Sequence, residues 1–275
     1  MDIFAQILRF LDIQMTTPQP YGLFHLLWFG VSIAGAVALC LWHRKHPTNQ
    51  PKVILGITAI VILLELYKQI NYSFSYESGI SFDYQWYIFP FQFCSTPMYA
   101  GLLAGLTRKG KLHTAACAYL ASYALFAGAA VMFYPTTVFV GTVGINIQTM
   151  VCHGSMIFIG IYLLATGYVK AEHKTILKAL PLFCVFVAMA VVMNEIAHLS
   201  GLLERETFNM FFVSPYCEPH LPVYSLVQES LDFPWCLMLY VLGFTAASHL
   251  LMLPAILLRR PKQQKKPIPA MAVNP

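Results

Sequence analysis

Apolar residues gather in long, nearly uninterrupted runs along this chain, separated by short polar stretches. A run of about 20 apolar residues is long enough to cross the hydrocarbon of a bilayer as an α-helix. Seven such runs occur, at about 24–42, 53–71, 85–106, 113–132, 148–168, 176–198 and 233–258. Pro90 and Pro97 interrupt the third run, but membrane helices tolerate proline. The pattern predicts an all-α integral membrane protein built as a seven-transmembrane helix bundle.

The composition supports this class of protein. Hydrophobic residues make up 58% of the 275 residues and charged residues only 11%, whereas a soluble domain carries roughly 25% charged residues. The runs and their connections use nearly the whole chain, so a second, soluble domain is not expected. We expect a membrane domain at 24–258, preceded by an extracytoplasmic amphipathic segment at 1–23 and followed by a basic cytoplasmic tail at 259–275.

The direction of the helices follows from the basic residues. Most of the 17 Lys and Arg residues fall in the connections after the first, third and fifth runs and in the tail, while the other connections are rich in Asp and Glu. Basic residues favour the cytoplasmic side, so the N-terminus is predicted to lie outside and the C-terminus in the cytoplasm. The net charge of +5 is interpreted as a signal for topology and lipid headgroups. No basic stripe with interleaved aromatic residues suggests a nucleic-acid partner.

Polar residues within the runs concentrate toward the outer ends of the predicted helices. A polar group in hydrocarbon is costly and usually faces the bundle interior or a wet cavity, so the clustering predicts one outward-facing polar cavity. Its expected members are His25, Glu65, Lys68, Gln69, Asn71, Gln92, Cys94, Gln148, His153, Asn194, Glu195, His198 and Asp232. The alternative is that each group only satisfies a neighbour, as Glu65 and Lys68 could by pairing three residues apart on one helix face.

Cys94 and His153 are the candidates for chemistry in this cluster. Cys94 lies in the sequence Pro-Phe-Gln-Phe-Cys-Ser-Thr-Pro, and His153 lies in Val-Cys-His-Gly-Ser. A thiol needs a base to become a thiolate nucleophile, and histidine is its usual partner. The predicted depths of the two residues permit contact. The other cysteines are mostly expected to be packing residues, and an odd count of seven does not support a disulfide framework.

The outer connection at 200–231 is rich in proline and aromatic residues. Cys217 and His220 have the two-residue gap seen between metal ligands. A structural zinc site normally has four Cys or His ligands, and no second close pair accompanies this one, so no metal is expected. The connection is too apolar for a freely solvated loop, and we expect it to fold back over the mouth of the cavity as a lid.

Three features together resemble a known family. They are the Cys in the third run, the His early in the fifth run, and a string after the sixth run in which Asn209 and Phe212 are followed by Pro219. With this arrangement the chain, from about 24 to 258, is similar to the YwaF-like integral membrane proteins. These are bacterial relatives of transmembrane protein 164.

The resemblance implies an activity and a site. Animal members are described as acyltransferases that move a fatty acyl chain between phospholipids with a Cys nucleophile and a His. By this likeness His153 accepts the proton of Cys94, the thiolate attacks an acyl ester, and the acyl-thioester passes to a lysolipid or water, with Thr96 as a weaker substitute nucleophile. Supporting roles are expected for oxyanion donors and for groups that orient the imidazole. The donors are Gln92, Asn194 or Asn209, and the orienting groups are Glu195 or Glu65.

On this interpretation the partners are membrane lipids, including an acyl-bearing phospholipid substrate, no cofactor is needed, and the location is a bacterial inner membrane. A different class of protein fits the same runs, namely a transporter or heptahelical sensor of a small polar ligand. Its binding groups would be Glu65, Lys68, Glu195 and His198. A haem protein using His25, His153 or His198 is a third alternative. The sequence leaves the oligomeric state and the choice between acyl transfer and hydrolysis open.

Overall fold

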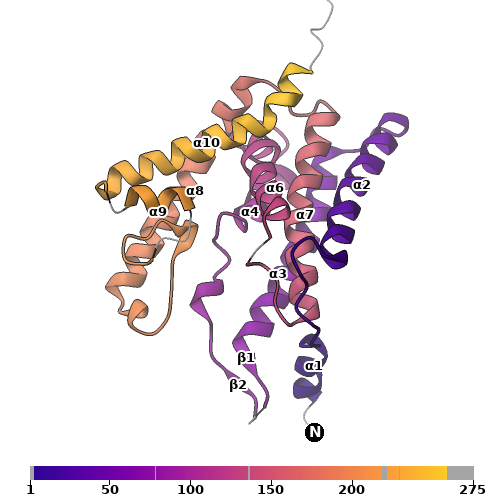
Figure 1. Cartoon of the computed structure of the whole chain (residues 1–275). Helices are drawn as coiled ribbons and strands as arrows, with labels where there is room; N and C mark the ends of the chain where they lie inside the picture. Colours follow the sequence, from indigo (N-terminus) through magenta and orange to yellow (C-terminus); the bar gives the residue numbers. More distant parts are fainter. Residues whose placement is uncertain (1–2, 78, 136, 219–221, 229, 259–275) are drawn as a thin grey trace, which may run out of the picture.

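The computed structural model describes residues 3–77, 79–135, 137–218, 222–228 and 230–258. Most of these residues are helical, which confirms the predicted all-α class (Figure 1). The helices are α1 (Ile3–Leu11), α2 (Leu23–Lys45), α3 (Gln50–Ser73), α4 (Thr96–Leu106), α5 (Lys111–Tyr119), α6 (Leu125–Phe133), α7 (Val143–Ala165), α8 (His173–Leu199), α9 (Pro222–Gln228) and α10 (Phe233–Leu257). A two-stranded antiparallel hairpin, β1 (Phe74–Ser75) and β2 (Ser81–Phe82), follows α3.

Six helices of the described chain are long and apolar enough to cross a membrane. They are α2, α3, α7, α8, α10 and the unbroken stretch Lys111–Phe133, in which a π-helical turn at Leu120–Ala124 joins α5 to α6. Large apolar side chains such as Leu63, Val192 and Leu250 are exposed along these helices, as expected where helices face lipid. Six of the seven predicted spans are therefore present as helices.

The third predicted span differs from the expectation of one helix over 85–106. Only α4 is a regular α-helix there, and its 11 residues reach about 16 Å, roughly half of the hydrocarbon thickness. Before it come a 3-10 turn at Trp86–Ile88 and irregular chain. Proline explains the break, because Phe89 adopts an extended conformation (φ −48°, ψ 131°) before Pro90. Pro97, in the first turn of α4, needs no intrahelical hydrogen bond and is tolerated.

The chain nevertheless returns from one end of the bundle to the other through this segment. In Figure 1 the N-terminus and the β-hairpin lie at the same end of the molecule, and α10 finishes at the opposite end. Residues 83–95 together with α4 carry the chain back from the hairpin end. This hairpin end also holds the N-terminal segment, because Met15 N–H donates to Gly141 O at 2.7 Å and Tyr67 Oη–H donates to Leu11 O at 2.6 Å.

The larger cluster of buried hydrophobic residues draws on α4, the Lys111–Phe133 helix, α7 and α8. Tyr119, Tyr123 and Phe183 are fully buried there, and the rings of Tyr123 and Phe183 stack at 4.4 Å. Gly128 permits the close approach of α6 to α7, since a Cβ at this position would lie 2.6 Å from the carbonyl oxygen of His153. The core thus fixes α7, which carries part of the candidate site.

Candidate functional site

Glu65 is the centre of a buried polar cluster between α3 and α7. Its Oε1 accepts from Lys68 Nζ at 2.8 Å and from Gln69 Nε2 at 2.7 Å. Its Oε2 accepts from Gln148 Nε2 of α7 at 3.3 Å. A buried carboxylate is costly unless it is paired and hydrogen-bonded, and Glu65, only 7% exposed, meets that requirement. The predicted pairing of Glu65 with Lys68 is present, and it belongs to a larger network.

The cluster also holds the start of the irregular third segment. Gln69 Nε2 donates a second hydrogen bond to Ile88 O at 2.9 Å, and Tyr84 Oη–H donates to Gln69 Oε1 at 2.7 Å. Burial, followed by the nearby Glu65 and Glu206 carboxylates, raises the pKa of Tyr84 above its usual 10.0. The phenol therefore stays protonated at neutral pH and remains a donor, so residues 84–88 are fastened to α3.

Cys94 lies in the turn that precedes α4. It lines a small cavity of about 10 Å³ together with Thr58 of α3 and Cys152 and Ser155 of α7. A space of that size is at the lower limit for a single water molecule. Gln148 of the Glu65 cluster also donates to Cys152 Sγ at 3.3 Å, and Cys152 lines the same cavity. Cys94 therefore lies beside the Glu65 cluster, as the sequence predicted, in a space too small for a substrate.

His153 has a defined hydrogen-bonding state. Its Nδ1 lies 2.8 Å from the carbonyl oxygen of Thr149, and since a carbonyl only accepts, Nδ1 carries the proton. In the neutral imidazole Nε2 is then an acceptor, and it has no hydrogen-bond partner among the described residues. The structure does not join His153 to Cys94. Its sequence neighbour Cys152 lines the Cys94 cavity and lies 3.3 Å from Gln148 Nε2.

Two of the expected oxyanion donors hold a loop instead. Gln92 Nε2 donates to Asn209 O and Gln92 Oε1 accepts from Phe211 N–H, both at 2.9 Å. Asn194 Nδ2 donates to Met210 O at 3.0 Å, and Asn194 Oδ1 accepts from Met210 N–H at 2.7 Å. In both side-chain amides, the nitrogen and the oxygen each form a hydrogen bond with the loop backbone. We therefore assign Gln92 and Asn194 to positioning the loop. Their expected role as oxyanion donors stays a prediction.

The loop held by these amides is a buried plug, defined here as residues 208–214. Met210, Phe211 and Val213 are completely buried, and the ring of Phe211 lies 5.7 Å from that of Phe93. Phe211 and Phe212 have φ of 59° and 56°, a conformation that is strained for bulky residues. The plug therefore packs against the segment that leads to Cys94.

Asn209 is the expected oxyanion donor that still has a free donor group. Its Oδ1 accepts from Ser214 N–H at 2.9 Å. Its Nδ2 is buried and has no hydrogen-bond partner among the described residues. A buried, unsatisfied donor is costly, so the amide is available to any acceptor that enters this part of the site.

Glu195 and His198 lie apart from the Glu65 cluster, on an exposed face of α8. Tyr216 Oη–H donates to Glu195 Oε2 at 2.8 Å, and its ring stacks on His198 with centroids 3.7 Å apart. The hydrogen bond to Glu195 raises the pKa of Tyr216. The expectation of a single cavity containing both residues is therefore corrected, because a depth along a helix does not specify which face a residue occupies. Neither residue contacts His153 in the described structure.

Two further predicted groups are engaged elsewhere. His25 is buried, and its ring nitrogens meet Met132 O at 3.0 Å and Tyr21 N–H at 3.1 Å. Thr96 Oγ1–H donates to Phe93 O at 2.8 Å and accepts from Tyr119 Oη–H at 2.6 Å. The hydroxyl of Thr96 is thus held by two hydrogen bonds, one donated and one accepted. His220 lies outside the described residues, and among those described no group of three or more His, Cys, Asp or Glu could hold a metal ion.

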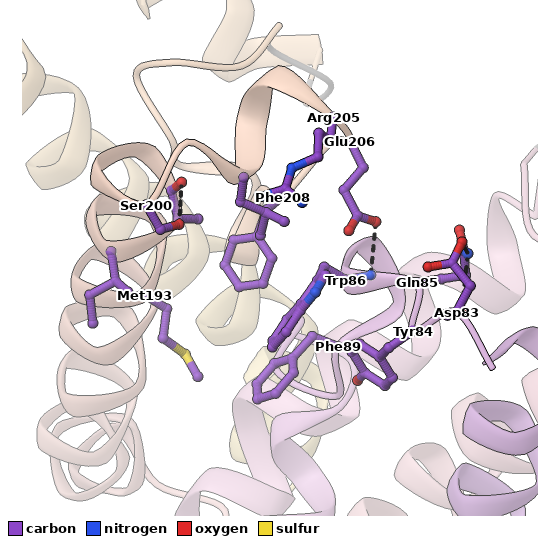
Figure 2. Close-up of a pocket in the computed structure, with 13 residues that line it drawn as sticks. Asp83, Tyr84, Gln85, Trp86, Phe89, Met193, Ser200, Arg205, Glu206 and Phe208 are labelled. Carbon is purple, nitrogen blue, oxygen red and sulfur yellow. Dashed lines mark hydrogen bonds between the residues drawn. The ribbon is translucent and has the colours of Figure 1, made fainter.

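A larger pocket of about 790 Å³ opens next to the plug, between residues 83–89 and the end of α8 (Figure 2). Tyr84 and Trp86 contact edge to face with centroids 5.0 Å apart, and Trp86 N–H donates to Glu206 Oε2 at 2.8 Å. Arg205 also lines the pocket and has no salt bridge among the described residues. This pocket was not predicted from the sequence. The aromatic residues between Tyr84 and Phe89 could have indicated a site here, since aromatic residues favour membrane interfaces.

The long apolar helices and the buried ionic cluster between them define a multi-pass α-helical membrane protein. The sequence profile of the TMEM164 family matches residues 18–253, so the chain belongs to the TMEM164 family. This match confirms the resemblance found in the sequence. No curated protein and no solved structure shows significant similarity to the chain.

Proposed function

We propose that this protein is a membrane-embedded enzyme that transfers acyl groups of phospholipids through Cys94, with His153 as the base. The observation that carries the proposal is the position of Cys94. It lies where the third segment changes from irregular chain to helix, beside the buried Glu65 cluster and next to α7, which bears His153. The resemblance to acyltransferases of the transmembrane protein 164 family supports the same pair of residues.

The chemistry uses groups whose protonation is defined. The Cys94 S–H gives its proton to Nε2 of His153, directly or through one water, and the thiolate adds to the ester carbonyl. The ester C–O bond then breaks, and the leaving alcohol takes the proton from the imidazolium. In the second half, His153 takes the proton of a lysolipid hydroxyl or of water, whose oxygen attacks the thioester carbonyl. The C–S bond breaks, and the imidazolium returns the proton to the Cys94 thiolate. The free Nδ2 of Asn209 is our candidate donor to the oxyanion.

The small size of the cavity around Cys94 implies a resting state. An acyl ester reaches the thiol only if the irregular segment or the plug moves away from α7. The strained conformations of Phe211 and Phe212 and the unsatisfied Nδ2 of Asn209 lower the cost of displacing the plug. We therefore assign the plug the gating role that the sequence suggested for the whole 200–231 connection.

The pocket in Figure 2 is our proposed place for the substrate headgroup. The guanidinium of Arg205 suits a phosphate, and the Tyr84 and Trp86 rings suit the depth of the glycerol region. Met193 and Ile196 line the same pocket with apolar surface for an acyl chain. We place this end of the bundle on the extracytoplasmic side, in a bacterial inner membrane, following the charge distribution and the resemblance.

Acyl-probe labelling tests the proposal. The purified protein in lipid nanodiscs is incubated with a phospholipid that carries an alkyne-tagged acyl chain, and hydroxylamine-sensitive label is mapped by peptide mass spectrometry. We expect label on the Cys94 peptide, none in Cys94→Ala, and at least tenfold slower labelling in His153→Ala. Cys152→Ala, which alters the same cavity, is the matched control and keeps the label. Label that persists in Cys94→Ala, or that maps to Cys152, would contradict the assignment.

The transporter or sensor alternative is favoured by one observation, the buried ion pair of Glu65 and Lys68. It predicts that a small polar ligand stabilises the protein against heat and that Glu65→Gln abolishes this effect while Cys94→Ala leaves it intact. The acyl-transfer proposal predicts the opposite dependence, with lipid turnover lost in Cys94→Ala.

A further inference from the structure

A second large pocket is lined by a different set of elements from the pocket in Figure 2. It measures about 830 Å³ and is bounded by α2, α6 and α7 on one side and by the C-terminal part of α10 on the other. This volume is within the range of ligand-binding pockets. Its walls are almost wholly apolar, with Phe29, Leu125, Ile161 and Met252 among them. No group proposed for the acyl-transfer site lines it.

The packing of the helices explains why this space is open. Figure 1 shows α10 inclined to α6 and α7, and helices that diverge in this way leave a wedge between them. Several of the lining residues are small and cannot fill the wedge, including Ala129 of α6, Ala165 of α7 and Ala255 of α10. In a membrane, an apolar space that opens between helices is filled by lipid chains, because water there would be costly.

One end of the cavity carries a positive charge. Lys170, in the turn after α7, is the cation among the lining residues. It is exposed and has no salt bridge among the described residues. The nearby carboxylate of Glu172 accepts from Lys178 Nζ at 3.3 Å. The Glu65 cluster meets α7 at Gln148, near the beginning of the helix, and Cys94 lies beside the middle of α7, whereas Lys170 follows its end. This charge is therefore at the opposite end of α7 from the Glu65 cluster.

We propose that this groove binds a phospholipid, with the phosphate paired to Lys170 and an acyl chain lying between α10 and α6. The apolar walls match the chain, and the single cation matches the phosphate. The lipid is distinct from the acyl substrate and stays bound while Cys94 works. It fills the gap between α10 and the rest of the bundle, so its removal weakens the attachment of α10. This site goes beyond the proposed function and does not depend on it.

Photo-crosslinking tests the groove. The full chain is reconstituted in phosphatidylcholine vesicles that contain a minor fraction of phosphatidylglycerol with a diazirine on its acyl chain. We expect crosslinks to concentrate on peptides covering Leu125–Phe133 and Leu251–Leu257. Ala255→Trp fills the groove and should lower these crosslinks at least fivefold. Ala246→Trp, at an exposed position of α10 outside the groove, is the matched control and should leave them unchanged.

The charge is tested separately. Lys170→Gln should lower the number of phosphatidylglycerol molecules retained in native mass spectrometry, while Lys174→Gln, at the same end of the bundle, should not. Cys94→Ala should retain the lipid in full, which separates this proposal from the enzymatic one. Three results would each overturn the proposal. The lipid could crosslink evenly to all lipid-facing helices, or its crosslinks could map to residues 259–275 in place of the groove peptides. Lys170→Gln could also retain as much phosphatidylglycerol as the wild type.

Discussion

The plug is held in the bundle by side-chain amides, and Asn194 provides the sharpest test of this attachment. Asn194→Ala removes both hydrogen bonds to Met210. Met210 O still accepts from Val213 N–H at 3.4 Å, whereas Met210 N–H is then buried without a partner. Leaving a buried polar group unsatisfied costs about 1–3 kcal/mol, unless the plug leaves its place and exposes this N–H to water.

The two outcomes of that competition are distinguishable. If the plug stays, the thermal midpoint of the protein in detergent falls by several degrees. If it leaves, the midpoint changes less, but limited proteolysis cuts the chain between Phe208 and Ser214 much faster than in the wild type. Asn194→Asp retains the acceptor for Met210 N–H and should fall between wild type and alanine. Glu195→Gln, on the exposed face of the same helix, is the control. Asn194→Ala with both wild-type midpoint and wild-type cleavage would refute the assignment of Asn194 as a positioning residue.

Two other substitutions test contacts between helices. Gly128→Ala should destabilise the protein by about 1–3 kcal/mol, because its Cβ would lie 2.6 Å from His153 O and 2.7 Å from Met156 Cβ; Gly56→Ala, which meets open space, should be neutral or stabilising in the same thermal assay. His249→Ala removes the 2.7 Å hydrogen bond to His173 that joins α10 to α8, at a cost of about 0.5–1.5 kcal/mol. His249→Gln, which can still bond to His173, should recover part of the loss, and equal midpoints for all three proteins would mean that the pair contributes nothing.

The sequence predicted the helices well where hydrophobic length alone decides the outcome. The prediction of one helix over 85–106 was wrong. A proline can be tolerated within a helix or can break it, and the outcome depends on neighbouring segments that the pattern of one chain does not reveal. Here Gln69 of α3 holds the broken segment by donating a hydrogen bond to Ile88 O. Gln92, within the segment, donates to Asn209 O of the plug. The polar cluster was predicted in part. Glu65, Lys68 and Gln148 meet as expected.

Residues that entered the predicted site by depth alone were less reliable. Asn194 and Glu195 are adjacent in sequence, so their depths are nearly equal, but one is buried against the plug and the other is exposed beside Tyr216. The roles of Gln92 and Asn194 both depend on the backbone path of the plug. For Gln92, the plug is also more than 100 residues away in the sequence. Such long-range hydrogen bonds leave no local pattern in the sequence.

The half-helical third segment has a consequence for how the protein is made. An 11-residue helix preceded by irregular chain exposes unpaired backbone groups, and lipid offers them no partners. The groups that shield this segment include Phe183 and Phe186 of α8 and the plug, all of which are synthesised later. The segment therefore cannot settle at its final depth when it first leaves the ribosome. Its insertion waits for α8 and the plug, so truncation before Phe211 should leave residues 83–106 accessible from the aqueous side during biosynthesis.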